Sequence, residues 1–130
     1  MNEESYIAAT KEAMSKAYVP YSNYPVGALI VTNNGNTYSG CNVENASYPL
    51  GNCAEASAIA SMVISGEKKI KTIYVMTKND KGGIPCVGCR QRIREFSDSN
   101  TQILMCSPDG VQQRINLSEL LPNSFGPEHL

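Results

Sequence analysis

The sequence predicts a single α/β domain over residues 1–130, in which helices pack on a mixed β-sheet. Two observations indicate this class. Segments with apolar residues at helical spacing alternate along the chain with short apolar runs typical of strands. No repeat or low-complexity stretch interrupts them. At this length roughly two thirds of the unfolded surface can be buried, which is enough for one hydrophobic core.

The first half of the chain predicts a helix, a hairpin and a second helix. Asn2 can cap a helix that carries acidic residues in its first turn and stops before Pro20. Residues 26–32 and 37–43 flank a polar, Gly-containing segment like the two strands of a hairpin. An Ala-rich helical pattern then covers residues 53–64.

The second half adds three strands and two helices. In chain order these are a strand at 70–77, a helix at 86–96 entered through Pro85, a strand at 102–106, an edge strand at 111–115 and a short helix from Ser118. The whole order is helix, strand, strand, helix, strand, helix, strand, strand, helix. It indicates an α/β sandwich built on a mixed sheet.

The charge balance argues against binding to a polyanion. The 11 Lys and Arg residues against 12 Asp and Glu residues give a net charge of -1, too weak a field for a phosphate backbone or an anionic membrane. The first residues show no basic stretch followed by an apolar run, and no run nears the ~20 apolar residues of a membrane span, so we expect neither a signal peptide nor a membrane anchor. We therefore expect a soluble, cytoplasmic protein with no nucleic-acid or membrane partner. In that reducing compartment the five cysteines should be free thiols.

Two short motifs at predicted helix starts contain the candidate catalytic residues. Cys53-Ala54-Glu55 begins one helix, and Cys86 and Cys89 lie at the start of the next. The positive end of a helix dipole lowers thiol pKa and favours the thiolate, the form that binds zinc. Cys86 and Cys89 can hold one ion, and Cys53 can add a third ligand from the neighbouring helix. Three ligands leave a fourth position open for water, and Glu55 is close enough to move that water's proton.

Two other interpretations of the Cys-x-x-Cys pair need comparison. A thioredoxin-like redox site gives no role to Cys53 or Glu55. A structural zinc site needs a fourth Cys or His, which Cys41, Cys106 and His129 do not plainly supply. The two cysteines lie in predicted strands, where we expect core positions, and the histidine lies near the C-terminus, where we expect a solvated tail. The catalytic interpretation is therefore favoured, and a zinc-stabilised structural module stays open.

Several motifs are spaced along nearly the whole chain. They are Ala17-Tyr18-Val19-Pro20-Tyr21-Ser22, Gly40-Cys41-Asn42-Val43-Glu44-Asn45, Tyr48-Pro49-Leu50-Gly51, Cys53-Ala54-Glu55, Pro85-Cys86, Cys89-Arg90-Gln91, Leu120-Leu121-Pro122 and Ser124-Phe125-Gly126-Pro127. Together they resemble the small homotetrameric cytidine deaminase family. The resemblance implies a three-layer α/β/α sandwich with a mixed five-stranded sheet, and a homotetramer with shared active sites. It also implies zinc-dependent hydrolysis of cytidine and deoxycytidine to uridine and deoxyuridine plus ammonia, in pyrimidine salvage.

The resemblance further implies the chemistry of the centre. One zinc ion per subunit, on Cys53, Cys86 and Cys89, activates a hydroxide for attack on C4 of cytosine, as in other zinc-dependent base deaminases. Glu55 is the implied proton carrier, first to ring N3 and then to the departing ammonia.

Substrate-binding roles are implied for six further residues. They are Asn42, Glu44, Tyr24, Ala54, Tyr48 and Phe125. Asn42 and Glu44 match the family's ribose-binding pair. Tyr24 stands where the family usually has a stacking Phe, and Phe125 matches an aromatic residue that reaches the neighbouring subunit's site. Another aminopyrimidine nucleoside stays open as the substrate.

One position departs from the family pattern. Many members carry an arginine where this chain has Ala56, and that arginine moderates the negative charge of the thiolates. We expect the helix dipoles, backbone amides near residues 87–90 and Arg90 to compensate. Arg92 should lie on a different helix face from Arg90 and Arg94, which argues against a basic track for a polynucleotide.

Overall fold

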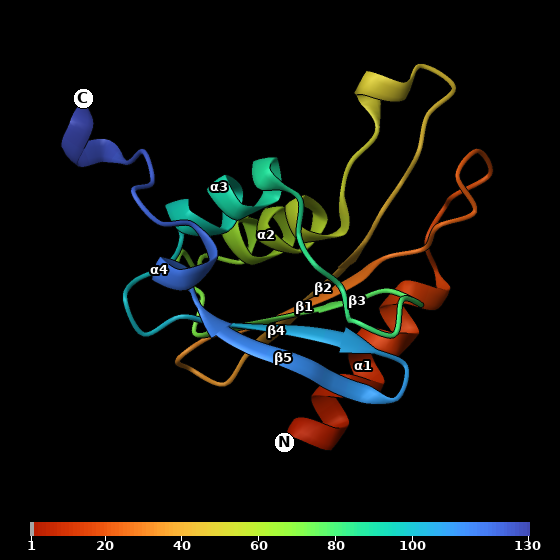
Figure 1. Ribbon diagram of the computed structural model, residues 1–130, viewed down its shortest axis with the longest axis horizontal. Helices are drawn as coiled ribbons and strands as arrows, with labels where there is room; N and C mark the ends of the chain where they lie inside the picture. The colour runs from red at the N-terminus through yellow and green to blue at the C-terminus, as the bar shows by residue number, and fades with distance from the viewer. Residues whose placement is uncertain (1) are drawn as a thin grey trace.

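The structure, a computed structural model, describes residues 2–130 and has three layers (Figure 1); Met1 lies outside the described residues. A five-stranded sheet of order β2-β1-β3-β4-β5 separates α1 on one face from α2 and α3 on the other. This confirms the predicted α/β/α sandwich with a mixed sheet. The elements are α1 (Glu3–Ser15), β1 (Gly27–Val31), β2 (Thr37–Cys41), η1 (Tyr48–Leu50), α2 (Ala54–Ile64), β3 (Thr72–Met76), α3 (Val87–Glu95), β4 (Gln102–Ser107), β5 (Gly110–Asn116), α4 (Leu117–Leu120) and η2 (Pro127–His129).

The strand directions bring three carboxyl ends to the same edge of the sheet. β1 is antiparallel to both β2 and β3, and β3 is parallel to β4. β2, β3 and β4 therefore run the same way. The chain leaves β2 toward α2 and leaves β3 toward α3, so both helices begin at this edge, and they contact each other. Ligand sites in open α/β sheets form at this kind of edge.

Apolar side chains fill both faces of the central strands. Ile30 and Ile73 pack toward α2, whereas their chain neighbours Leu29 and Tyr74 pack toward α1. Successive residues of a strand point to opposite faces, so each strand contributes to two cores. Because helices cover both faces of the sheet, the sequences of these strands are continuous apolar runs.

The starts of α1 and α4 follow the local capping signals. Asn2 accepts a hydrogen bond from the Ser5 backbone N–H at 3.0 Å and begins α1 as predicted. The last helix, α4, begins at Leu117, one residue before the predicted start at Ser118. Asn116 is its N-cap and accepts from the Glu119 N–H at 3.0 Å, because asparagine caps as well as serine and comes first in the chain. No helix within residues 2–130 has both the length and the apolar character that crossing a membrane requires.

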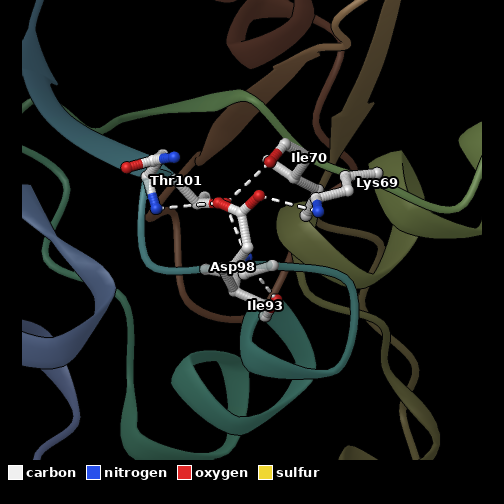
Figure 2. A network of polar contacts seen from close by, with 7 residues as sticks. Lys69, Ile70, Ile93, Asp98 and Thr101 are labelled. Atoms are coloured by element: carbon white, nitrogen blue, oxygen red, sulfur yellow. Dashed lines mark hydrogen bonds and ion pairs between the residues drawn. The ribbon is translucent and has the colours of Figure 1, made fainter.

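A polar turn after α3 fixes that helix against the sheet (Figure 2). The Asp98 N–H donates to the Thr101 hydroxyl oxygen at 3.0 Å, and the Thr101 hydroxyl donates to the Ile70 carbonyl at 2.7 Å. Lys69 lies 2.7 Å from the Asp98 carboxylate. These contacts join the end of α3 to the chain just before β3 and β4. These contacts thereby fix the direction of α3 and with it the position of its N-terminal turn, which carries Cys89.

Gly40 allows α2 to lie directly on β2. A Cβ at this position would come within 2.5 Å of the Ala54 carbonyl oxygen and of the Ala58 nitrogen, which are main-chain atoms of α2. Main chain in a packed helix cannot turn aside as a flexible side chain can, so a larger residue would displace the helix. Ala54 lies between Cys53 and Glu55, so this contact also sets where those two residues lie.

We predict that Gly40→Ala lowers the free energy of unfolding by about 1–3 kcal/mol, the usual cost of overpacking. Urea unfolding followed by circular dichroism measures the change. Ser39→Ala, at the exposed neighbouring position of β2, is the matched control and should change stability by less than about 0.5 kcal/mol. Equal stability of the two variants would contradict the close contact between β2 and α2.

Candidate active site

Two thiols and one carboxyl group meet where α2 and α3 begin. Cys53 is the N-cap of α2, Glu55 lies in its first turn, and Cys89 lies in the first turn of α3. The candidate ligand atoms of these three residues all lie within 4.8 Å of one another. The sulfur atoms of Cys53 and Cys89 are 2.8 Å apart. The structure therefore brings together three of the four residues that the two motifs predicted.

The surroundings of Cys53 favour its thiolate. The hydrogen bond that Cys53 shares with Cys89, with smaller help from the Ala56 N–H and the Arg92 charge, lowers the pKa of Cys53 to about 6. The same hydrogen bond, together with burial, raises the pKa of Cys89. Of the two thiols, Cys53 is therefore the one whose thiolate these surroundings favour more.

Glu55 is a buried carboxyl group beside that charge. Only 4% of the residue is exposed. Burial disfavours its ionised form and raises its pKa to about 7, and the Cys53 charge acts in the same direction. Near neutral pH such a group can both hold and release a proton, as a general acid–base catalyst must.

Cys86 is placed differently from the other two cysteines of the motifs. It is the N-cap of α3 and is exposed, whereas Cys89 is buried. Within residues 2–130, the group of ligand atoms within 4.8 Å of one another comprises Cys53, Glu55 and Cys89, without Cys86. Its place at the same helix end as Cys89 keeps it a predicted third ligand.

The donor chemistry of this group fits a zinc ion. Zinc in proteins prefers thiolate and imidazole ligands, and Cys53 and Cys89 supply two thiols from two helices. Both lie at helix N-termini, where the backbone dipole favours the thiolate. The raised pKa of Glu55 suits proton transfer better than metal coordination.

A cavity of about 320 Å³ forms a second part of the site. Its lining residues are Tyr21, Ser22, Glu44, Asn45, Tyr48 and Gly51. Glu44 accepts hydrogen bonds from the backbone N–H groups of Tyr21 and Ser22, each at 3.1 Å, and from the Ser22 hydroxyl. The Ser22 hydroxyl holds the pKa of Glu44 below its ordinary value. The cavity, of a size that suits a small molecule, therefore presents an ionised carboxylate among tyrosine rings.

Main-chain pairing places this cavity beside the start of α2. Val43 lies between Asn42 and Glu44 and exchanges two backbone hydrogen bonds with Asn52, each 2.9 Å long. Asn52 directly precedes Cys53. The predicted ribose-binding pair and the thiol group are therefore neighbours, joined by this short ladder.

The Asn42 side chain holds the preceding loop in place. Its amide oxygen accepts from the Val26 N–H at 2.9 Å, and its amide nitrogen donates to the Tyr24 carbonyl at 2.9 Å. A primary amide has two N–H groups, so one is left for another partner. The Tyr24 ring is exposed beside this loop.

The other predicted substrate residues lie in three different environments. Tyr48 is 75% exposed, and its ring centre lies 5.9 Å from that of Tyr21 in the cavity wall. The Ala54 side chain belongs to the core, so a ligand can meet only its main chain. Phe125 is 57% exposed, and its carbonyl accepts from the Gln91 amide at 2.9 Å. It belongs to the C-terminal segment, which projects from the body of the molecule (Figure 1).

The basic residue near the thiols is Arg92, which the sequence interpretation missed. Its Nη1 lies 3.7 Å from the Cys89 sulfur and 3.8 Å from the Cys53 sulfur. Arg90, which we expected to compensate their charge, donates instead to two backbone carbonyls at 2.9 and 3.1 Å. The three-residue spacing from Cys89 to Arg92, which puts both on one helix face, is the signal that identifies it.

Comparisons with known proteins point to the same kind of site. A family model described as the cytidine and deoxycytidylate deaminase zinc-binding region matches residues 1–105. The chain is 37% identical to a cytidine deaminase of Sporosarcina psychrophila, over 100% of this chain and 96% of that one. It is 42% identical to one of Mycoplasma genitalium, over 96% of each. The crystal structure of a cytidine deaminase from Burkholderia pseudomallei is similar at a TM-score of 0.90 and 38% identity, over 96% of this chain and 100% of that one.

Proposed function

Since the chain belongs to the cytidine and deoxycytidylate deaminase family, we propose that it hydrolyses the 4-amino group of free cytidine and deoxycytidine. The products are uridine or deoxyuridine and ammonia. The observation that carries the proposal is the buried Glu55 carboxyl group within 4.8 Å of the Cys53 and Cys89 sulfurs. A proton carrier beside soft metal ligands is what a hydrolytic zinc centre requires.

Cys53, Cys86 and Cys89 would hold one zinc ion per subunit. Three protein ligands leave a fourth position open, which distinguishes a catalytic site from a closed structural one. The ion supplies Lewis-acid chemistry that makes water a nucleophile at neutral pH.

Glu55 moves the protons of the reaction. It takes one from the water that adds to C4 and delivers it to ring N3, which makes C4 more electrophilic. It then transfers the second water proton to the amino nitrogen, and the C4–N bond breaks to release ammonia. A pKa near 7 suits transfer in both directions.

Glu44 and Asn42 bind the sugar in this proposal. The ionised carboxylate can accept from sugar hydroxyls, and the remaining amide N–H of Asn42 can donate to them. Polar groups placed to bind sugar hydroxyls select ligands that carry them, so a nucleoside should be preferred to bare cytosine. Tyr24 and Tyr48 offer aromatic rings for the base, and Ala54 offers its main chain.

A free nucleoside fits the protein better than a polynucleotide. Arg94 is engaged by Ser124 and Glu128, and Arg90 by backbone carbonyls, so neither is available to a phosphate backbone. Because the substrate is a preformed nucleoside, we assign the reaction to pyrimidine salvage. Because the site needs free thiols, we assign the protein to the cytoplasm.

We further propose a homotetramer with shared active sites. Large apolar side chains are exposed on two segments that project from the side of the sheet bearing α2 and α3 (Figure 1). These segments are η1 with Tyr48 and Leu50, and the C-terminal segment with Phe125. Large apolar side chains exposed on projecting segments are typical of association surfaces. We assign Phe125 to the active site of a neighbouring subunit.

Glu55→Gln keeps the shape of the side chain and removes the proton carrier, so we predict that kcat falls about 10²- to 10⁴-fold. The ultraviolet change is measured with cytidine, deoxycytidine, cytosine, cytidine monophosphate and a single-stranded oligonucleotide, alongside zinc content. Zinc content should stay at the parent value. Glu12→Gln, which removes an exposed carboxylate from α1, is the matched control and should keep full activity. Near-normal turnover of the Glu55 variant would refute the mechanism.

Phe125→Ala should raise the KM for cytidine about 2- to 10-fold, which corresponds to the binding free energy of one aromatic contact. Thermal stability should change little. Leu130→Ala, at a 95% exposed position of the same segment, is the control and should leave KM unchanged. Sedimentation velocity gives the oligomeric state of each variant. Full activity in a protein that sediments as a monomer would exclude a shared site.

A further inference from the structure

Arg92 is the basic residue whose guanidinium reaches both sulfurs of the thiol group. It lies one turn after Cys89 on α3, and its Nη1 is within 3.8 Å of both Cys89 and Cys53. Within residues 2–130, no other Lys or Arg side chain donates to a cysteine sulfur. The other two arginines of α3 point away from the sulfurs. Arg90 binds the segment around α4, and Arg94 binds the C-terminal segment.

A centre built from these residues carries excess negative charge. Zn²⁺ with three thiolates has a net charge of -1, and the neighbouring Glu55 adds a further negative charge whenever it ionises. Helix dipoles at the N-termini of α2 and α3 supply about half an elementary charge each, together about one, so the charge of an ionised Glu55 stays uncompensated. A full positive charge that donates hydrogen bonds to the sulfurs is a stronger compensation.

The packing of α2 beside α3 shows why the charge comes from position 92. Ala56 and Arg92 line the same groove between the two helices, together with Ile59 and Val63 of α2. The Ala56 side chain is a single methyl group and brings no charge to this groove. A basic side chain placed at either position would face the same pair of helix N-termini.

We propose that Arg92 compensates the charge of the cysteine ligands, acting from α3 in place of a basic residue at position 56 of α2. This inference rests on the proposed zinc centre. Arg92 is a positioning residue, because it acts through the sulfurs that it contacts. Its hydrogen bonds withdraw electron density from the thiolates and stabilise the charged ligand set.

Cobalt substitution of the full chain tests this role without relying on activity. In Co²⁺-loaded protein the thiolate-to-metal charge-transfer band reports the electron density on the sulfurs. Arg92→Gln should shift that band to longer wavelength and weaken zinc binding about 10- to 100-fold in competition with a chelator, as expected for loss of an outer-shell partner. Ala56→Arg, added to Arg92→Gln, should restore part of both changes. Arg114→Gln removes an exposed arginine that is paired with Glu3 and should behave as the parent.

A folded Arg92→Gln protein with the parent band and parent zinc affinity would overturn the proposal. If the Gln variant does not fold, Arg92→Met, which keeps the apolar stem of the side chain, is measured with the same two outcomes. A parent protein with no cobalt–thiolate band would instead refute the zinc centre itself. The failure of the proposed function and the failure of the role of Arg92 are therefore distinguishable.

Discussion

The direct packing of α2 on β2 at Gly40 is the constraint on which the rest of the site depends. It fixes the start of α2, where Cys53 and Glu55 lie, over the edge of the sheet at which β2, β3 and β4 end. The polar turn at Asp98 and Thr101 holds the other end of α3, so the start of that helix reaches the same edge. Two sulfurs from distant parts of the sequence are thereby brought to 2.8 Å.

The same surroundings shift the pKa values of the two ionisable groups of the centre in opposite directions. Cys53 has a lowered pKa because a neighbouring thiol, a backbone N–H group and Arg92 favour its charge. Glu55, two residues further on, has a raised pKa because it is buried beside that charge. A thiolate ligand and a proton carrier can therefore coexist at neutral pH on a single turn of helix. The proposed deamination depends on this separation, and the role inferred for Arg92 is to stabilise the charged partner.

The features that the sequence predicts well are those set by local spacing. The start of α1 follows from the capping residue Asn2, and α2 and the central strands follow from the spacing of their apolar residues. The same pattern places the motif cysteines at helix N-termini. What the sequence does not reveal depends on packing between segments. The bonds from Ser22 to Glu44 join residues 22 positions apart, and Arg92 matters only because α2 lies beside α3. The exposed position of Cys86 is a further detail that spacing alone cannot predict.

The X-ray absorption spectrum of the zinc-loaded protein tests most directly whether Cys53, Cys86 and Cys89 form a zinc centre with an open position. We expect three sulfur atoms at about 2.3 Å and one oxygen or nitrogen atom at about 2.0 Å from the metal. Cys86→Ala should lose one of the three sulfurs, whereas Cys106→Ala, in the core on the α1 face, should keep them all. Four sulfur ligands, or three that persist in Cys86→Ala, would contradict the proposed centre.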